Sequence, residues 1–341
     1  MSEPTSPAGE PSPRTMRAIV VSETGGTDKL VATDLPLPPL RPDWVRIKVR
    51  AFGVNESEVT TRKGLSGPDV TYPRVPGIEC AGVVAEAPAG SGLTSGQQVA
   101  TMMGGMGRSY DGAYAEYVLV PASQVIPFTS DLPWETLGAL PEMVQTAYGS
   151  LSTGLDLRPG QSLLIRGGTS TVGLTAAAIA KDLGATVLST TRRPDRADML
   201  REAGVDHPVV DHGEIAGSVR EIFPDGVDAA LELVGAGHLH DTLRAVRVHG
   251  TLCFTGALAD QWTIPDFSPL GFIPNGVRLT AYGGAATDLS ADVLDHQLRA
   301  IADGRLKVSV AKIYHGLESV REAQADLESG AYPGKHVVVL D

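Results

Sequence analysis

The sequence has few cysteines, no long apolar run and no basic block, and each absence excludes a class of protein. Only two of its 341 residues are cysteines. Cys80 and Cys253 lie far apart in apolar surroundings, which excludes a disulfide framework and favours a reducing compartment. No apolar run approaches the roughly 18 residues that a spanning helix needs, so we expect no membrane segment. A net charge of -12 disfavours nucleic acid and anionic membrane surfaces as partners.

The composition predicts a cytoplasmic globular protein of two domains. Hydrophobic residues make up 42% and charged residues 20% of the chain, and 341 residues exceed what a single core usually fills. The opening stretch MSEPTSPAGEPSPRT (1–15) is rich in Pro, Ser and Gly and lacks the apolar segment of a signal peptide. We therefore expect a disordered tail over 1–15 and an ordered chain from Met16.

The pattern of the chain changes near its middle. Between MRAIVV (16–21) and YAEYVLVP (114–121), short β-rich runs alternate with Gly/Pro turns, which is typical of a largely antiparallel β-domain. From SLLIRGG (162–168) to GVRLTAYGG (276–284), strand and helix patterns alternate. Because parallel strands need crossover helices, this predicts a doubly wound parallel sheet. The predicted fold class is α/β, with a β-rich domain beside a doubly wound one.

The stretch RGGTSTVG (166–173) predicts a nucleotide site. It joins a predicted strand to an alanine-rich helix, and small residues there let backbone N–H groups and the helix end approach a pyrophosphate. Gly173 is placed for close helix-to-strand packing, and Ser170 stands where a second glycine is usual, adding a hydroxyl donor. The predicted pyrophosphate contacts are Gly168, Thr169, Ser170, Thr171, Val172 and Gly173.

Arginines at the end of the next strand favour NADPH over NADH. In LSTTRRPDR, Thr191 is followed by Arg192, Arg193 and Arg196, with no acidic residue before Asp195. An acidic residue there would suit the ribose hydroxyls of NAD, whereas arginines suit a 2′-phosphate. The alternative is a solvated basic helix start, but cations at a helix N-terminus oppose its dipole.

From about Met16 to its end the chain resembles the medium-chain dehydrogenase/reductase superfamily, in particular its zinc-free, quinone oxidoreductase-like branch. The stretches that carry the resemblance are RAIVVSETGG, GVNESE, PRVPGIECAGVV, DGAYAEYVLVP, QTAYGSL, GGTSTVGLTAAAIAK, LELVG and GKHVVVL. The resemblance implies a GroES-like catalytic domain (16–130 and 308–341) interrupted by a Rossmann NADPH-binding domain (131–307), with the active site in the cleft between them. It also implies a homodimer, formed along the exposed edge strand in 276–284.

The residues at the zinc positions predict catalysis without a metal. Zinc-dependent relatives carry a cysteine where this sequence has Asn55 and a histidine where it has Ile78. No histidine precedes His207, so with two cysteines neither a catalytic nor a structural tetrahedron can be assembled. Cys80, beside the vacated position, is interpreted as a small buried residue.

The resemblance also assigns roles to single residues. Asn55 lies beside the nicotinamide and substrate, either as an amide donor or as a left-handed or turn residue. Glu58 either anchors a loop or transfers a proton, and Tyr110 is a candidate proton donor that water can replace. Lys335 either reaches the cofactor phosphates or lies at the surface. The further predicted cofactor contacts are Thr146 (to the carboxamide or ribose), Val234 and Gly256.

One residue departs from the pattern for NADPH. Where many NADPH-using relatives have a tyrosine near the 2′-phosphate, the stretch HPVVDHGE places Asp211, whose charge argues against NADPH at this point.

Metal-free chemistry points to the reduction of an electron-poor acceptor. Without a Lewis acid nothing holds an alkoxide, whereas hydride transfer from NADPH to a quinone or enone needs only orientation and hydrogen-bond donors. A second reading is an enoyl-thioester or natural-product tailoring reductase. A third, from a different class, is a non-catalytic NADPH-binding protein.

Overall fold

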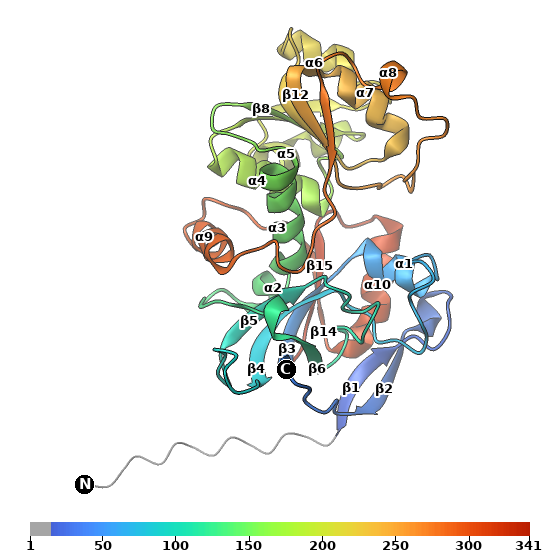
Figure 1. The fold of residues 1–341 in the computed structure, drawn as a ribbon, viewed down its shortest axis with the longest axis vertical. Helices are drawn as coiled ribbons and strands as arrows, with labels where there is room; N and C mark the ends of the chain where they lie inside the picture. The colour runs from blue at the N-terminus through green and yellow to red at the C-terminus, as the bar shows by residue number, and fades with distance from the viewer. Residues whose placement is uncertain (1–14) are drawn as a thin grey trace, which may run out of the picture.

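The computed structural model describes residues 15–341, which form two lobes (Figure 1). The predicted tail lies outside the described residues except for Thr15, which begins the first strand. The lobe drawn below in Figure 1 holds the N-terminal and C-terminal parts of the described chain, and the lobe above holds the middle.

The lower, β-rich lobe is built from both ends of the described chain. Its elements are β1 (Thr15–Val20), β2 (Val31–Pro36), β3 (Trp44–Val54), α1 (Glu56–Arg62), β4 (Glu79–Glu86), β5 (Gln98–Met102), β6 (Tyr117–Pro121), β7 (Ile126–Pro127), β14 (Val310–His315), α10 (Val320–Ser329) and β15 (Lys335–Val339). The main sheet has the order β14-β15-β3-β4-β5-β7, with β6 also paired to β3. Because β15 runs antiparallel to β3, with Val338 opposite Phe52, the C-terminal segment completes the sheet that the N-terminal segment begins.

The upper lobe is a doubly wound parallel sheet, as predicted. Its elements are β8 (Ser162–Arg166), α4 (Thr171–Asp182), β9 (Thr186–Thr191), α5 (Ala197–Glu202), β10 (His207–Val210), α6 (Ala216–Ile222), β11 (Val227–Glu232), α7 (Leu239–Arg244), β12 (Val246–Phe254), α8 (Pro269–Phe272) and β13 (Arg278–Ala281). The strand order is β10-β9-β8-β11-β12-β13, and every pairing is parallel. The order reverses between β8 and β11, which is where such folds bind their ligands. We call this the Rossmann lobe.

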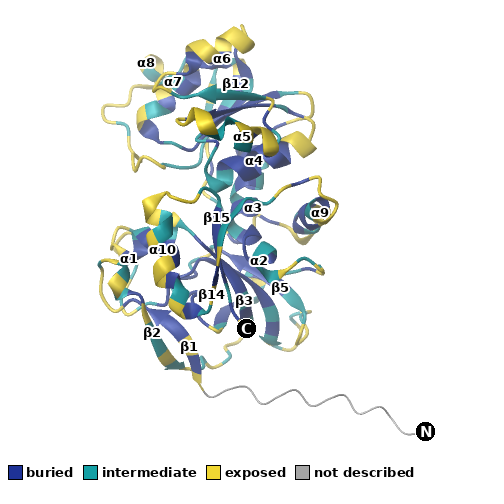
Figure 2. Ribbon diagram, turned by 180° about the vertical axis from the view of Figure 1, so that it is seen from behind, coloured by how far each residue is buried: buried dark blue, intermediate teal, exposed yellow. Residues whose placement is uncertain are grey.

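Burial explains why the strands of the Rossmann lobe are continuously apolar. Leu163, Leu164 and Ile165 of β8 are all fully buried, although neighbouring side chains point to opposite faces. Helices cover both faces of a parallel sheet, so no side of β8 meets water. Figure 2 shows this dark-blue interior enclosed by helices whose outer sides are exposed.

The two lobes meet along α3 (Leu140–Gly149), which follows α2 (Trp134–Leu137) and continues into a π-helical turn at Ser150–Gly154. Leu140 and Met143 of α3 share one core with Leu298 of α9 (Ala291–Ala302) and with Ala81 and Met102 of the β-rich lobe. The predicted boundaries after 130 and 307 pass through this shared core, so the division into domains along the chain stays a prediction.

Candidate active site

The turn between β8 and α4 is packed closely around its glycines. Gly167 has φ +90°, a conformation that favours glycine. A Cβ on Gly168 would overlap Ser189 Oγ, and a Cβ on Gly173 would lie 2.7 Å from the carbonyl oxygen of Gly167. Small residues therefore allow α4 to begin directly against the ends of β8 and β9, which is the packing expected of Gly173.

The side chain of Ser170 caps α4 instead of pointing at a ligand. Its Oγ accepts the N–H of Gly173 (3.1 Å) and donates to the carbonyl oxygen of Gly167 (2.8 Å). Because a hydroxyl donates one proton, the donor expected for a phosphate is used within the turn. Thr171 and Val172 begin the helix, and their N–H groups have no intrahelical acceptor. These N–H groups and the positive helix end fit a pyrophosphate.

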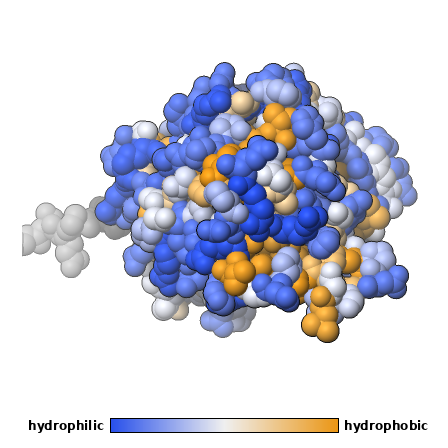
Figure 3. Space-filling view, turned by 90° about the horizontal axis from the view of Figure 1, so that it is seen from above, coloured by the Kyte–Doolittle hydropathy of each residue, from blue (hydrophilic) through white to orange (hydrophobic). Residues whose placement is uncertain are grey.

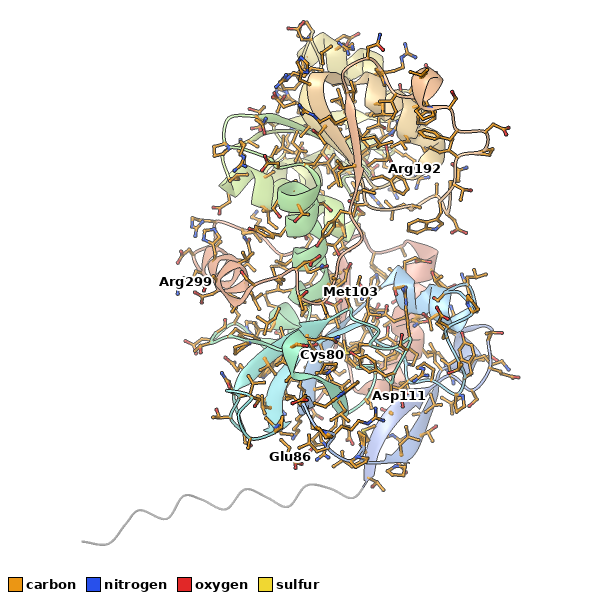
Figure 4. The ribbon with its side chains drawn as sticks, viewed as in Figure 1. Cys80, Glu86, Met103, Asp111, Arg192 and Arg299 are labelled. Carbon is orange, nitrogen blue, oxygen red and sulfur yellow. The ribbon has the colours of Figure 1, made fainter. Side chains whose placement is uncertain are left out.

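The three arginines after β9 differ in their pairing. Arg193 forms an ion pair with Asp195 (2.6 Å), and its N–H donates to Thr191 Oγ1 (3.1 Å). Arg192 is exposed on the Rossmann lobe (Figure 4). Within residues 15–341, the guanidinium groups of Arg192 and Arg196 have no hydrogen bond or ion pair. Two guanidiniums without a hydrogen-bonded partner in the described residues thus remain at the carboxyl end of β9, and, after the hydrogen bond from Arg193, the charge of Arg196 helps lower the pKa of Asp195.

Asp211 is ion-paired with a buried arginine that the sequence did not single out. Arg166, fully buried at the end of β8, holds both carboxylate oxygens of Asp211 (2.8 and 3.1 Å) and also binds Asp241 (2.9 Å). Burial works to raise the pKa of Asp211, but the hydrogen bonds and charge of Arg166 lower it below its usual value. The carboxylate of Asp211 is therefore ionised and held by Arg166, which it shares with Asp241.

Val234 and Gly256 lie at the same edge of the sheet, beside the reversal of strand order. The N–H of Val234 donates to the carboxylate of Glu232 (2.7 Å), the last residue of β11, and the N–H of Gly256 donates to the Glu232 carbonyl oxygen (3.3 Å). Sequence and structure thus bring these two residues to the carboxyl ends of β11 and β12.

A buried group of charged side chains lies where the lobes meet, and we call it the carboxylate cluster. Its members are Asn55, Glu58, Glu79, Glu142 and Lys335. They come from the end of β3, from α1, from the start of β4, from α3 and from the start of β15. A Cβ on Gly53 would overlap both the Lys335 and the Glu79 side chain, so this glycine makes room for their ion pair.

Glu58 has the geometry of an anchor. It is 1% exposed, and its carboxylate accepts the N–H groups of Asn55 (2.8 Å) and Ile78 (2.9 Å). These bonds tie the start of α1 to the loop before β4. Burial, aided by the charge of Glu79, raises the pKa of Glu58 to about 7.

The amide of Asn55 is turned toward the cluster. Its Oδ1 accepts from Lys335 Nζ (2.5 Å) and its Nδ2 donates to Glu79 (2.9 Å) and, more weakly, to Glu58 (3.4 Å). The donors expected to meet a substrate oxygen are therefore engaged within the protein. Asn55 has φ -124° at the N-terminus of α1, so the alternative of a left-handed residue is wrong.

Lys335 is an interior residue. It is 2% exposed, which overturns the surface alternative. Its ammonium contacts Glu79 (2.6 Å), Asn55 (2.5 Å) and Glu142 (3.3 Å), so all three N–H donors are engaged. No donor of Lys335 is left for the cofactor phosphates that it was expected to contact. Burial works to lower the pKa of Lys335, but the charges of Glu79 and Glu142 raise it overall.

Thr146 of α3 is hydrogen-bonded to the carboxylate cluster and is itself half-buried where the two lobes meet. Its Oγ1 lies 3.0 Å from Glu142 Oε1, one helical turn earlier on α3, and 3.2 Å from Gln145 Oε1. Asn55, Glu142 and Thr146 are all half-buried. Sequence reasoning missed Glu142, although its position four residues before Thr146 on one helix face was a usable signal.

Tyr110 is not brought together with Asn55 and Glu58. Its hydroxyl donates to Gln124 (2.7 Å), and its ring packs edge-on against Trp44 at the opposite end of β3 from Asn55 (5.1 Å between centroids). Burial raises the pKa of Tyr110, with a further contribution from Cys80. The proposed role as proton donor stays a prediction that this geometry does not favour.

Residues 15–341 contain no group of three or more His, Cys, Asp or Glu side chains arranged to hold a metal ion. Ile78 has no ligand atom, and Cys80 is buried in the β-rich lobe (Figure 4). The described residues therefore do not fit a catalytic zinc site.

Within residues 15–341, no helix is long and apolar enough to cross a membrane.

Comparisons with known proteins agree with both lobes. The alcohol dehydrogenase GroES-like domain matches residues 41–130, and the zinc-binding dehydrogenase domain matches residues 171–296. A probable quinone oxidoreductase of Leishmania amazonensis is 29% identical over 89% of this chain and 91% of that protein. The synaptic vesicle membrane protein VAT-1 homolog of Danio rerio is 26% identical over 96% and 70%. A solved structure of a mycobacterial protein complexed with NADPH is 28% identical, covers 95% and 99%, and has a TM-score of 0.81.

A GroES-like lobe joined to a Rossmann lobe, with a nucleotide turn at the strand-order reversal, defines a two-lobed dehydrogenase or reductase that binds NAD(P). The chain belongs to the medium-chain dehydrogenase/reductase superfamily, in its quinone oxidoreductase-like branch, and is an oxidoreductase. The fold class and the resemblance seen in the sequence are thereby confirmed.

Proposed function

We propose that the protein is a zinc-independent, NADPH-dependent reductase that transfers hydride to a quinone or an α,β-unsaturated carbonyl compound. The observation that carries the proposal is the pair of guanidiniums without a hydrogen-bonded partner in the described residues, Arg192 and Arg196, beside a nucleotide turn. The nearby carboxylates Asp195 and Asp211 are ion-paired with Arg193 and Arg166. When bound, NADPH supplies the hydride.

The chain's own residues would bind and orient the reactants. The turn from Gly168 to Gly173 and the start of α4 would hold the pyrophosphate. The two free arginines would hold the 2′-phosphate. Asn55, Glu142 and Thr146 form a polar wall at the junction of the lobes, held rigid from behind by Lys335 and Glu79.

Two exposed apolar side chains in the loop after β12 support an apolar acceptor. Asp260, in the loop after β12, lies near enough to Glu56 of α1 to help raise its pKa, after burial and alongside Glu328. Leu258 and Trp262, on either side of Asp260, are 61% and 63% exposed.

The test is oxidation of NADPH and NADH by the purified protein against quinones, simple enones and enoyl thioesters, with a metal chelator present throughout. We expect turnover that prefers NADPH and is untouched by chelation. Faster reduction of enoyl thioesters than of quinones would select a tailoring or acyl-chain reductase instead. Tight NADPH binding without turnover on any acceptor would contradict the proposal and favour a binding role.

A homodimer formed through the Rossmann lobe is part of the proposal. Within residues 15–341, strand β13 pairs only with β12, which leaves its outer edge for a second copy. Phe267 and Leu270, near α8, are 43% and 99% exposed, and Figure 3 shows apolar side chains among hydrophilic ones at this end of the molecule. Light scattering should give twice the 35.6 kDa mass of the chain at micromolar concentration. A monomeric mass would contradict it.

Both cysteines are free and buried, which supports the reducing, cytoplasmic location that we propose.

A further inference from the structure

His336 is a buried histidine on β15 that the proposed reaction does not use. Neighbouring side chains of a strand point to opposite faces, so Lys335 enters the carboxylate cluster while His336 meets Tyr314 of β14 on the other face. The histidine is 1% exposed, and the two rings are stacked with 5.8 Å between their centroids. A charge on this imidazole would therefore lack the hydration that it has in the unfolded chain.

Hydrogen bonds toward α10 assign one proton to this ring. Tyr314 Oη lies 2.8 Å from Asp326 Oδ2 and 2.8 Å from His336 Nδ1. Hydrogen bonds from Lys312 (2.7 Å) and Tyr314 lower the pKa of Asp326 below its usual value, so its carboxylate is ionised and only accepts. Tyr314 gives its single proton to this carboxylate, and its oxygen accepts from the Nδ1–H of His336. The charge of His336 consequently depends on its other nitrogen, Nε2.

The second ring nitrogen has no acceptor for a proton. Within residues 15–341, Nε2 of His336 is buried and forms no hydrogen bond. Protonation would create a buried charge with an unpaired N–H, and both are unfavourable. Burial lowers the pKa of His336 below its usual value of 6.5, and the charges of Lys312 and Lys335 lower it further. The backbone of Tyr332 and the charge of Asp326 act in the opposite direction without reversing the shift.

The other groups around the ring do not compensate a charge on it. Glu322 of α10 is bound to Lys312 (2.7 Å). The ring of Tyr332 meets His336 edge-on, with 6.5 Å between centroids, and Lys312 Nζ lies 5.3 Å from the centre of the Tyr332 ring. On β3, which pairs with β15, the residue opposite His336 is Val54. The neutral ring is therefore the form that fits between β14, β15 and α10.

We propose that His336 makes the docking of residues 310–339 sensitive to acid, because the segment packs with this ring neutral and is loosened when the ring takes up a proton. A group whose pKa is lower in the folded than in the unfolded chain contributes stability that is present above the unfolded pKa and is lost as the pH falls. For His336 the loss begins near pH 6.5 and grows at lower pH. Lys335 lies on the same strand, so loosening β15 also weakens the contacts of its ammonium with Asn55 and Glu142. Acid thereby acts on the junction of the lobes from the opposite face of the sheet.

The test is hydrogen exchange measured by mass spectrometry on the purified protein at pH 7.5 and pH 5, with each rate divided by the intrinsic rate at that pH. In the wild type, the opening equilibrium constant of residues 310–339 should rise by up to about 30-fold more than that of the Rossmann lobe, because protonation of an exposed histidine at pH 5 supplies that factor. In His336→Phe, which cannot take up a proton, this excess should be absent. His315→Gln, at an exposed histidine of β14, is the matched control and should keep it.

A second measurement, on the wild type alone, covers the case in which His336→Phe does not fold. The NMR signal of the His336 ring, assigned through its contact with the Tyr314 ring, should remain that of a neutral imidazole at pH 6, where an exposed histidine is mostly charged. A ring that titrates at pH 6.5 or above would overturn the inference, as would a wild-type excess that is absent or no larger than in His336→Phe. Neither measurement uses cofactor or acceptor, so a negative result leaves the proposed function standing.

Discussion

Replacing Arg166 by methionine is expected to lower the free energy of unfolding by about 3–5 kcal/mol, the usual effect of removing one partner from a buried ion pair. Arg166 is fully buried and its guanidinium forms ion pairs with both Asp211 and Asp241, whose side chains are 8% and 17% exposed. Without it, two carboxylates remain in the lobe with no cation. Urea denaturation followed by circular dichroism measures the change.

We also expect the loss of stability in Arg166→Met to depend on pH. In the wild type the pKa of Asp211 is lowered, so its contribution to stability is present above its unfolded-state pKa and is lost as the pH falls. In Arg166→Met the charged aspartates oppose folding, so the difference from the wild type should be larger at pH 7 than at pH 4. Arg201→Met, which breaks an exposed pair with Asp198, serves as the control and should change stability by less than about 1 kcal/mol. Equal effects of the two variants would contradict the role given to Arg166.

Replacing both Arg192 and Arg196 by alanine is expected to weaken NADPH binding by on the order of 100-fold while leaving NADH binding nearly unchanged. Hydrogen bonds to a charged group contribute roughly 1.5–3 kcal/mol each in favourable sites, and exposure of Arg192 reduces its share, so about 3 kcal/mol for the pair corresponds to that factor. Calorimetric titration with each nucleotide measures it.

The matched control is Arg193→Ala. Because Arg193 is already paired with Asp195, its removal should change NADPH affinity only a few-fold. If the double variant binds NADPH as tightly as the wild type, the 2′-phosphate is held elsewhere and the preference for NADPH loses its structural support.

Local chemistry explains which features could be read from the sequence. The nucleotide turn depends on small residues at adjacent positions, and the close approach of Gly173 to the carbonyl of Gly167 is a contact between neighbours in the chain. The parallel sheet follows from alternating strand and helix patterns, which are also local. The same locality misled the interpretation of Ser170, because a serine before a helix caps that helix before it serves any ligand.

The candidate site could be predicted only in part, because its residues are distant in the sequence. Lys335 meets Asn55 only because β15 pairs with β3, and the sequence pattern alone did not show that the C-terminal segment returns to the first sheet. Glu142 acquires its contacts only when α3 lies against the β-rich lobe.

The sequence by itself determined the alternation of strands and helices, the glycine turn before α4 and the arginines after β9, since each depends on residues within one or two elements. The tertiary structure alone decided which charges are free. Arg192 and Asp211 looked equally available along the chain, yet burial beside Arg166 compensates the aspartate and leaves the arginine exposed. Ionisable groups owe their chemistry to burial and to partners from distant elements, and those are set only when the chain is folded.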